Sequence, residues 1–295
     1  MKKEKIVVLY GGDSPEREVS LKSGGAVLTA LQQEGFDVCG VDASSRELVE
    51  EILRISPDIC YIALHGEDGE NGRVQSLLEI LKIKHTASDI RASVITMDKM
   101  LSKEVWERNG LLTPKAKLLT ESLKEAKELK FPVVIKPTST GSSIGITKVN
   151  LEMELESAYK EAAQYGEVMI EEWVTGKEMT VAVLNDEVFS SVWIEPKNEF
   201  YDYESKYGGQ SIYHSPSGLP DDKELEIREL AKRAYDVLSC KGHARVDFIY
   251  SDGKFYLIEI NTSPGMTEHS LSPKSAKALG YSFNDLVRKV VEQAK

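Results

Sequence analysis

The first third of the chain alternates short apolar runs with stretches whose apolar residues recur at helical spacing. Ile6–Tyr10 is a fully apolar run that ends at Gly11-Gly12, as a buried parallel strand does before a turn. Leucines then share one face of a predicted helix that starts at Ser20 and is closed by Gly35. The cycle continues with predicted strands over Phe36–Val41 and Ile59–Leu64 and helices over Arg46–Ile55 and Val74–Leu81. This rhythm predicts a parallel sheet with helices on its faces over residues 1–95, with ligands at the carboxyl ends of its strands.

The middle of the chain predicts a second unit, over residues 96–178. A long helix over Ser93–Arg108 leads to Gly110 and Pro114, where the pattern changes. The apolar runs after it predict strands over Lys117–Leu119, Val133–Lys136 and Val168–Trp173, and helices over Ser122–Leu129 and Glu152–Tyr165.

The last part predicts an antiparallel unit over residues 179–295. Alternating strands over Met179–Leu184 and Val188–Ile194 are joined by the turn signal Asn185-Asp186. Residues 196–218 show no period, and a stretch of that length is expected to be functional. The remaining elements are a helix over Lys223–Leu238, a hairpin of Ala244–Tyr250 and Phe255–Asn261 around Asp252-Gly253, and a final helix capped by Ser282. The predicted fold class is mixed α/β with three units.

The composition of the chain excludes several classes of binding partner and of protein. Acidic residues outnumber basic ones by 48 to 37, and the formal net charge of −11 disfavours nucleic acid and anionic lipid as partners. No apolar stretch approaches the ~18 residues of a membrane span. The three cysteines form no CxxC pair, and we expect them to be free core residues. These features predict a cytoplasmic protein that binds neither nucleic acid nor membrane.

The segment Lys136–Gly145 is a candidate phosphate site. A lysine at the end of an apolar strand, followed by a loop of small residues, brings a cation and several backbone N–H groups together. A flexible loop beside a lysine that extends to solvent is the alternative, and this segment alone does not separate the two.

The hairpin near the C-terminus is a candidate metal site. Glu259 and Asn261 share a strand face, and Asp247 falls opposite Glu259 if the turn at Asp252-Gly253 is short. Oxygen ligands of this kind suit Mg²⁺. The alternative is a solvated polar sheet face, which the apolar residues on both sides of these positions disfavour.

Two further signals are weaker. Glu171, Glu172 and Glu178 lie near the end of a predicted strand and could accept hydrogen bonds from an amine or a ribose, although such residues are usually solvated. His65 shows no metal-ligand spacing, and by itself it indicates a structural role.

Together these segments resemble the ATP-grasp ligases and, more narrowly, the D-alanine–D-alanine ligase family. The resemblance runs from end to end and keeps the order of the segments. The matching stretches are Gly11–Ser20, Ala63–Gly66, Glu70–Arg73, Met97–Lys99, Lys136–Gly145, Glu171–Glu178, Phe200–Tyr207, Ala244–Asp247 and Glu259–Leu271.

The resemblance implies a role for each matching residue. The ATP-binding residues would be Lys99, Lys136, Ser142, Ser143, Glu171, Glu172, Val174, Glu178 and Lys206. Two Mg²⁺ or Mn²⁺ ions would be held by Asp247, Glu259 and Asn261. The D-alanine-binding residues would be Glu16, His65, Lys206, Ser270 and Leu271. The residues that act on the reacting groups or tie the loop shut would be Glu16, Ser142, Tyr207, Arg245 and Gly265.

The resemblance also implies the activity. The first D-alanine would be activated as an acyl phosphate by ATP and then attacked by the amine of the second, for peptidoglycan precursor synthesis. A D-alanine–D-lactate ligase or another ATP-grasp carboxylate–amine ligase is the nearest alternative, and a non-catalytic nucleotide sensor with the same fold is a more distant one. We expect segment 196–218 and the loop at Lys136–Gly145 to exclude water from the acyl phosphate. We also expect the protein to form a homodimer.

Overall fold

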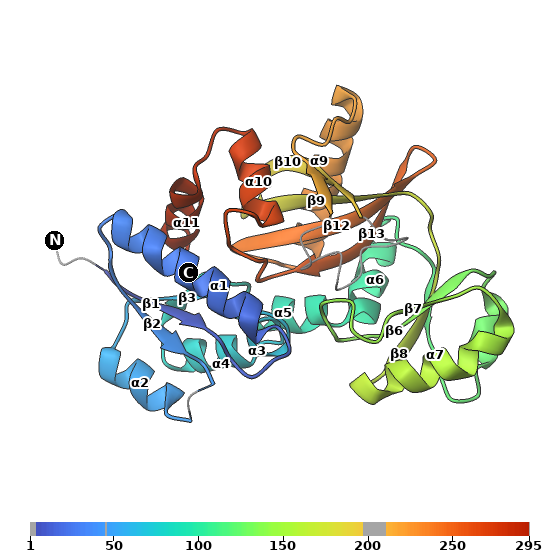
Figure 1. Ribbon diagram of the computed structural model, residues 1–295, viewed down its shortest axis with the longest axis horizontal. Helices are drawn as coiled ribbons and strands as arrows, with labels where there is room; N and C mark the ends of the chain where they lie inside the picture. The colour runs from blue at the N-terminus through green and yellow to red at the C-terminus, as the bar shows by residue number, and fades with distance from the viewer. Residues whose placement is uncertain (1–3, 45, 197–210, 295) are drawn as a thin grey trace.

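The computed structural model describes residues 4–44, 46–196 and 211–294, which form three separate β-sheets (Figure 1). One sheet is parallel and two are antiparallel, so the predicted mixed α/β class is confirmed. Within these described residues, none of the helices has the length and apolarity that a membrane crossing requires.

The N-terminal sheet is parallel, with strand order β2-β1-β3-β4. Its strands are β1 (Lys5–Tyr10), β2 (Asp37–Asp42), β3 (Ile59–Ile62) and β4 (Lys84–His85). The helices that alternate with them are α1 (Arg17–Gln33), α2 (Leu48–Ile55), α3 (Glu67–Glu70) and α4 (Arg73–Ile80). The strand–helix rhythm predicted for this region is therefore confirmed, although α1 begins before Ser20 and the short β4 and α3 were not predicted.

The middle sheet is antiparallel, with strand order β5-β8-β6-β7. Its strands are β5 (Ala116–Leu118), β6 (Val133–Pro137), β7 (Thr147–Val149) and β8 (Val168–Glu172). Helix α7 (Leu155–Ala162), flanked by the 3₁₀ turns η2 (Glu152–Glu154) and η3 (Ala163–Tyr165), covers one face. Figure 1 shows this sheet at the right of the molecule, away from the N-terminal sheet.

The third sheet is antiparallel, with strand order β11-β10-β9-β12-β13. Its strands are β9 (Lys177–Leu184), β10 (Glu187–Glu195), β11 (Ile212–His214), β12 (His243–Ser251) and β13 (Lys254–Asn261). Helices α9 (Asp221–Val237), α10 (Leu271–Ala278) and α11 (Phe283–Glu292) follow or flank these strands. The predicted cap at Ser282 is present, since its Oγ accepts a hydrogen bond from the backbone N–H of Asp285.

The turns of this sheet form where the sequence predicts them. Asn185, Asp252 and Gly253 adopt positive φ angles of 52°, 49° and 76°. Asn, Asp and Gly tolerate this conformation better than other residues, and two successive positive φ angles suit the twist of a hairpin.

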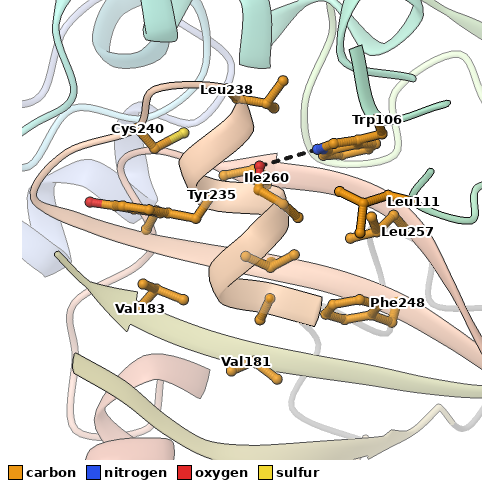
Figure 2. Packing of buried hydrophobic residues seen from close by; sticks show 14 of the residues in the cluster. Trp106, Leu111, Val181, Val183, Tyr235, Leu238, Cys240, Phe248, Leu257 and Ile260 are labelled. Atoms are coloured by element: carbon orange, nitrogen blue, oxygen red, sulfur yellow. Dashed lines mark hydrogen bonds between the residues drawn. The ribbon is translucent and has the colours of Figure 1, made fainter. Parts of the chain in front are cut away.

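The largest core lies between the third sheet and the helices on one of its faces (Figure 2). Trp106 is fully buried there, and its indole N–H donates to the carbonyl of Ala234 in α9 at 3.2 Å. Helices α5 (Ile90–Met97) and α6 (Lys99–Arg108) thus contribute to the core of this sheet.

Three predictions about local structure were wrong. The helix over Ser93–Arg108 is two helices, because the Asp98 side chain accepts hydrogen bonds from the backbone of Met100 and Leu101 and starts α6. The segment 122–129 holds only a 3₁₀ turn, η1 (Lys124–Glu128), after Leu123 adopts φ +53°. Cys39 is only half-buried, whereas Cys60 and Cys240 are buried, and all three are free.

Candidate active site

A cavity of about 370 Å³ lies between the middle sheet and the third sheet. Strands β6 and β8 line one side, and β9, β10, β12 and β13 line the other. Its lining includes most of the predicted nucleotide residues, namely Lys99, Lys136, Ser143, Glu171, Glu172, Val174 and Glu178. It also includes two of the predicted metal ligands, Asp247 and Glu259.

A buried charge cluster lies at the middle-sheet side of the cavity. The Lys136 Nζ donates to Glu171 Oε1 at 2.8 Å, and the Lys103 Nζ is 2.5 Å from Glu171 Oε2. All three side chains are at most 5% exposed. Burial opposes ionisation of Glu171, but the charges of Lys103 and Lys136 outweigh it and lower the pKa of Glu171 below its ordinary value. Burial lowers the pKa of Lys103 to about 8, although Glu171 opposes that shift.

Lys99 links the cavity to the small-residue loop. Its ammonium donates to the carbonyl of Thr140 at 2.7 Å and lies 3.3 Å from Glu259 Oε2. The lysine begins α6, whose start is fixed by the Asp98 cap, so a helix terminus positions this cation.

The hairpin of β12 and β13 has the register expected from the sequence. Asp247 pairs with Glu259, and Arg245 pairs with Asn261. A β-bulge follows, because Phe248 pairs with Leu257 and leaves Ile258 as an extra residue in β13. Ile258 and Glu259 both line the cavity as neighbours in the chain.

Asp247 accepts several hydrogen bonds. Arg245 donates from Nε at 2.9 Å and from its terminal guanidinium nitrogen at 2.7 Å. Thr180 Oγ1 donates at 2.6 Å, and Asn261 Nδ2 donates at 3.0 Å. The carboxylate is therefore held in one orientation at the edge of the cavity.

The donors on this hairpin are hard oxygens, which fit Mg²⁺ or Mn²⁺ rather than a softer metal. Within the described part of the chain, no three His, Cys, Asp or Glu side chains lie close enough together to hold a metal ion by themselves. Two carboxylates and an amide suit a hydrated ion that takes its other ligands from phosphate and water.

Glu16 and the small-residue loop meet at a second position. Ser142 Oγ donates a hydrogen bond to Glu16 Oε1, so the contact expected between these residues is present. A Cβ at Gly66 would come within 2.5 Å of Glu16 Oε2, and one at Gly141 within 3.0 Å. Ser142 and the next residue adopt φ angles of 52° and 59°, which are strained for a residue other than glycine. Close approach to Glu16 thus depends on the glycines and on an unusual loop conformation.

His65 and Glu70 lie on the same side of the molecule as Glu16. The His65 ring nitrogens contact the carbonyl of Ser263 at 2.6 Å and the hydroxyl of Ser23 at 3.1 Å. Burial lowers the pKa of His65 below its ordinary value, so we expect a neutral ring. Glu70 accepts backbone N–H groups from Gly66 at 2.9 Å and from Ser263 at 3.1 Å, and burial together with the charge of Glu16 raises its pKa to about 7.

The loop between β13 and α10 carries the other predicted substrate residues. Ser270 is the N-cap residue immediately before α10, and its Oγ accepts the backbone N–H of Thr267 at 3.0 Å. Leu271 is buried, and Gly265 lies close enough to Ser270 that an added Cβ would be 3.3 Å from its Oγ. Lys206 and Tyr207 lie outside the described residues.

The sequence reasoning missed Lys103 and gave no role to Glu70. Lys103 follows Lys99 by one helical turn, so the two share a face of α6, and that spacing was an available signal. Glu70 lies within one of the stretches that carry the family resemblance, but nothing in the sequence shows that it is close to Glu16.

Comparisons with known proteins show which family this chain belongs to. A family model described as D-ala D-ala ligase C-terminus matches residues 104–292. A D-alanine–D-alanine ligase from Francisella tularensis subsp. novicida is 66% identical, with both chains covered completely. The chain belongs to the D-alanine–D-alanine ligase family.

Two solved structures share the fold over nearly the whole chain. The D-alanine–D-alanine ligase from Bacillus anthracis complexed with ATP has a TM-score of 0.88 at 31% identity, covering 98% of this chain and 97% of that one. The VanG D-Ala:D-Ser ligase from Enterococcus faecalis has a TM-score of 0.86 at 31% identity, covering 99% of both chains. The expected ATP-grasp architecture of a D-alanine–D-alanine ligase is therefore confirmed.

Proposed function

We propose that this protein joins two D-alanine molecules at the expense of ATP, through an acyl phosphate, to supply peptidoglycan precursor. One chain of contacts carries the proposal. Glu259 at the cavity contacts Lys99, which binds Thr140 in the same loop from which Ser142 binds Glu16. A nucleotide in the cavity and an amino acid at Glu16 would therefore be held by one connected set of side chains.

ATP occupies the cavity between the two antiparallel sheets. Its phosphates bind Lys99 and Lys136 under the loop of Ser142 and Ser143, and Lys206 is assigned to the transferred phosphate by family resemblance. Its adenine and ribose bind Glu171, Glu172, Val174 and Glu178. The cavity's position and its lining lysines support this placement.

Two Mg²⁺ or Mn²⁺ ions are assigned to Asp247, Glu259 and Asn261. When bound, they would neutralise the negative charge of the ATP phosphates while the γ-phosphoryl group is transferred to the carboxylate of D-alanine. Arg245 holds Asp247 in place through two hydrogen bonds, which supports a fixed ligand rather than a mobile surface carboxylate.

The chemistry proceeds in two displacements. A carboxylate oxygen of the first D-alanine attacks the γ-phosphorus of ATP, and ADP leaves. The amine of the second D-alanine then attacks the acyl carbon, phosphate leaves, and the amine loses a proton. Glu16 and His65 position the first D-alanine, and Ser270 and Leu271 position the carboxylate of the second. Arg245 and the backbone N–H of Gly265 stabilise the negative charge that develops on the acyl oxygen.

The acceptor is D-alanine. The Enterococcus faecalis structure is named a D-Ala:D-Ser ligase, so the fold accommodates other acceptors. Identity of 66% over the full chain to a D-alanine–D-alanine ligase supports D-alanine here. By family resemblance Tyr207 would join the Ser142–Glu16 contact and hold the loop closed over both substrates.

Four features remain predictions. They are closure of segment 196–218 over the site, a homodimer, a cytoplasmic location, and units bounded at residues 1–95, 96–178 and 179–295. The three separate sheets support the division into units.

Glu259→Gln tests the site most directly. The change is nearly isosteric but removes a charge needed beside the phosphates, so ADP release should fall by orders of magnitude while thermal unfolding stays close to wild type. Glu187→Gln, which removes an ion pair to Lys289 outside the cavity, is the matched control. Full turnover by Glu259→Gln at saturating Mg²⁺ would remove Glu259 from the site.

A further inference from the structure

Helix α6 presents two lysines to the same side, and only one of them reaches the cavity. Lys99 lines the cavity, whereas Lys103, one turn later, does not and is only 2% exposed. A lysine buried this deeply needs a partner, because an unpaired ammonium group away from water is unstable. Lys103 has three such partners. The weakest is the carbonyl of Pro114, a residue that lines the cavity, at 3.4 Å, and the other two connect Lys103 to the two sheets.

The first partner is Glu171 on β8, whose Oε2 lies 2.5 Å from Lys103 Nζ. The second is Thr113 Oγ1, which accepts from Lys103 Nζ at 2.5 Å and donates to the carbonyl of Leu257 on β13 at 2.8 Å. Lys103 therefore bridges the middle sheet and the third sheet directly behind the cavity.

The two oxygens of Glu171 are divided between two lysines. Oε1 accepts from Lys136, which faces the cavity, and Oε2 pairs with Lys103, which lies behind it. The cluster thus has two ammonium groups for one carboxylate. Without Lys103, Lys136 would be the one remaining lysine of this cluster to neutralise Glu171. Its charge would then be shared between Glu171 and any anion in the cavity.

We propose that Lys103 is a positioning residue for ATP, acting through Glu171: it balances that carboxylate from behind and leaves the charge of Lys136 available to phosphate. This inference rests on the proposed placement of the nucleotide beside Lys136 and Glu171. It assigns Lys103 no contact with either substrate.

The test is a mutant cycle read out by nucleotide binding. Lys103→Met should weaken binding of a non-hydrolysable ATP analogue, and raise the KM for ATP, by about tenfold, because Lys136 would then share its charge with Glu171 and its charged hydrogen bond to phosphate would weaken. The KM values for D-alanine should stay close to wild type. The control is Lys117→Met, which removes an exposed ion pair between Lys117 on β5 and Glu128 in η1. It should leave analogue binding unchanged.

The second arm is Glu171→Gln with and without Lys103→Met. If Lys103 acts through Glu171, its removal should change analogue binding much less in the Gln background than in the wild-type background. If Lys103→Met alone does not fold, the double variant, which has no unpaired buried carboxylate here, is compared with Glu171→Gln alone. Equal analogue binding by these two variants supports the inference, and weaker binding by the double variant would overturn it.

The outcomes separate the inference from the proposed function. Equal losses in both backgrounds, or an equal rise in the KM values for ATP and D-alanine, would overturn the role of Lys103. Normal analogue binding by Lys103→Met together with weak binding by Lys136→Met would overturn it as well and leave the nucleotide site in place. Normal binding by Lys136→Met would overturn both.

Discussion

Glu171 and Glu70 are two carboxylates with low exposure whose pKa values shift in opposite directions. Glu171 is the more buried of the two, yet its pKa is lowered, because two lysine ammonium groups contact its two oxygens. Glu70 is only half-buried, yet its pKa is raised to about 7, because burial and the nearby charge of Glu16 outweigh the backbone N–H groups that it binds. Burial alone therefore does not decide the charge of a carboxylate in this protein: it dominates the pKa of Glu70, whereas two neighbouring lysines override it at Glu171.

The two regions also differ in what their charges can do. The cluster around Glu171 has two ammonium groups for one carboxylate beside a cavity, which suits phosphate. The Glu16 side has two carboxylates close to each other, which suits the ammonium group of an amino acid. Three substitutions test this difference, and the expected effects decrease from the first to the third.

The largest effect is expected for Glu171→Gln. The substitution leaves two buried lysines without their counter-ion, so the free energy of unfolding at pH 7 should fall by about 3–5 kcal/mol. Urea denaturation measures the loss. Glu128→Gln, which removes an exposed ion pair to Lys117, is the control and should cost under about 1 kcal/mol. Equal stability of the two variants would show that Glu171 does not hold the cluster together.

Glu16→Gln should give an intermediate effect, on the other region. Loss of a charge-assisted hydrogen bond to the substrate ammonium is worth about 1.5–3 kcal/mol, so the KM of one D-alanine should rise about ten- to a hundredfold. The KM for ATP should stay near wild type, the reverse of the pattern expected for Lys103→Met. Steady-state kinetics with each substrate varied in turn provides the comparison. A change confined to ATP would contradict the assignment of Glu16 to the amino acid.

Glu70→Gln should have the smallest effect, visible only as a change with pH. Because the pKa of Glu70 rises from 4.5 to about 7 on folding, the wild-type protein loses stability as the pH rises through that window. Gln has no such charge, so the stability of the variant relative to wild type should improve between pH 5 and pH 8, by about 1–2 kcal/mol after allowance for solvent screening. Urea denaturation gives the stability difference between variant and wild type at each of the two pH values. Any hydrogen bond that Gln loses contributes equally at both, so the change in this difference reports the titration of Glu70. A constant difference would mean that Glu70 titrates normally.

Much of the fold could be predicted because its signals are local. The parallel sheet follows from apolar runs alternating with helical periods, and the hairpin of β12 and β13 follows from the turn signal at Asp252-Gly253. A two-residue turn alone would place Ile258 opposite Asp247, and the bulge at Ile258 moves Glu259 into that position. No glycine or turn residue marks this bulge in the sequence.

The errors and omissions arise where one capping residue interrupts a helical pattern, or where a contact joins residues that are far apart in the sequence. Asp98 falls within a continuous helical pattern, so one helix was predicted, although its side chain caps a second helix. Lys103 has the sequence context of an exposed helical lysine, and only the fold shows Glu171 and Thr113 beside it. The contact of Ser142 with Glu16 was expected from family resemblance and not from spacing, because 126 positions separate the two residues.

The packing of α11 against the N-terminal sheet has a consequence for synthesis of the chain. Ile6, Val8 and Leu31 share one core with Leu286 and Val290, and α1 lies beside α11 in Figure 1. A ribosome makes the N-terminal residues first, so this core stays incomplete until α11 has emerged. Part of the apolar surface of the N-terminal strands therefore stays exposed during most of translation. It is covered only when α11 (Phe283–Glu292) packs against it.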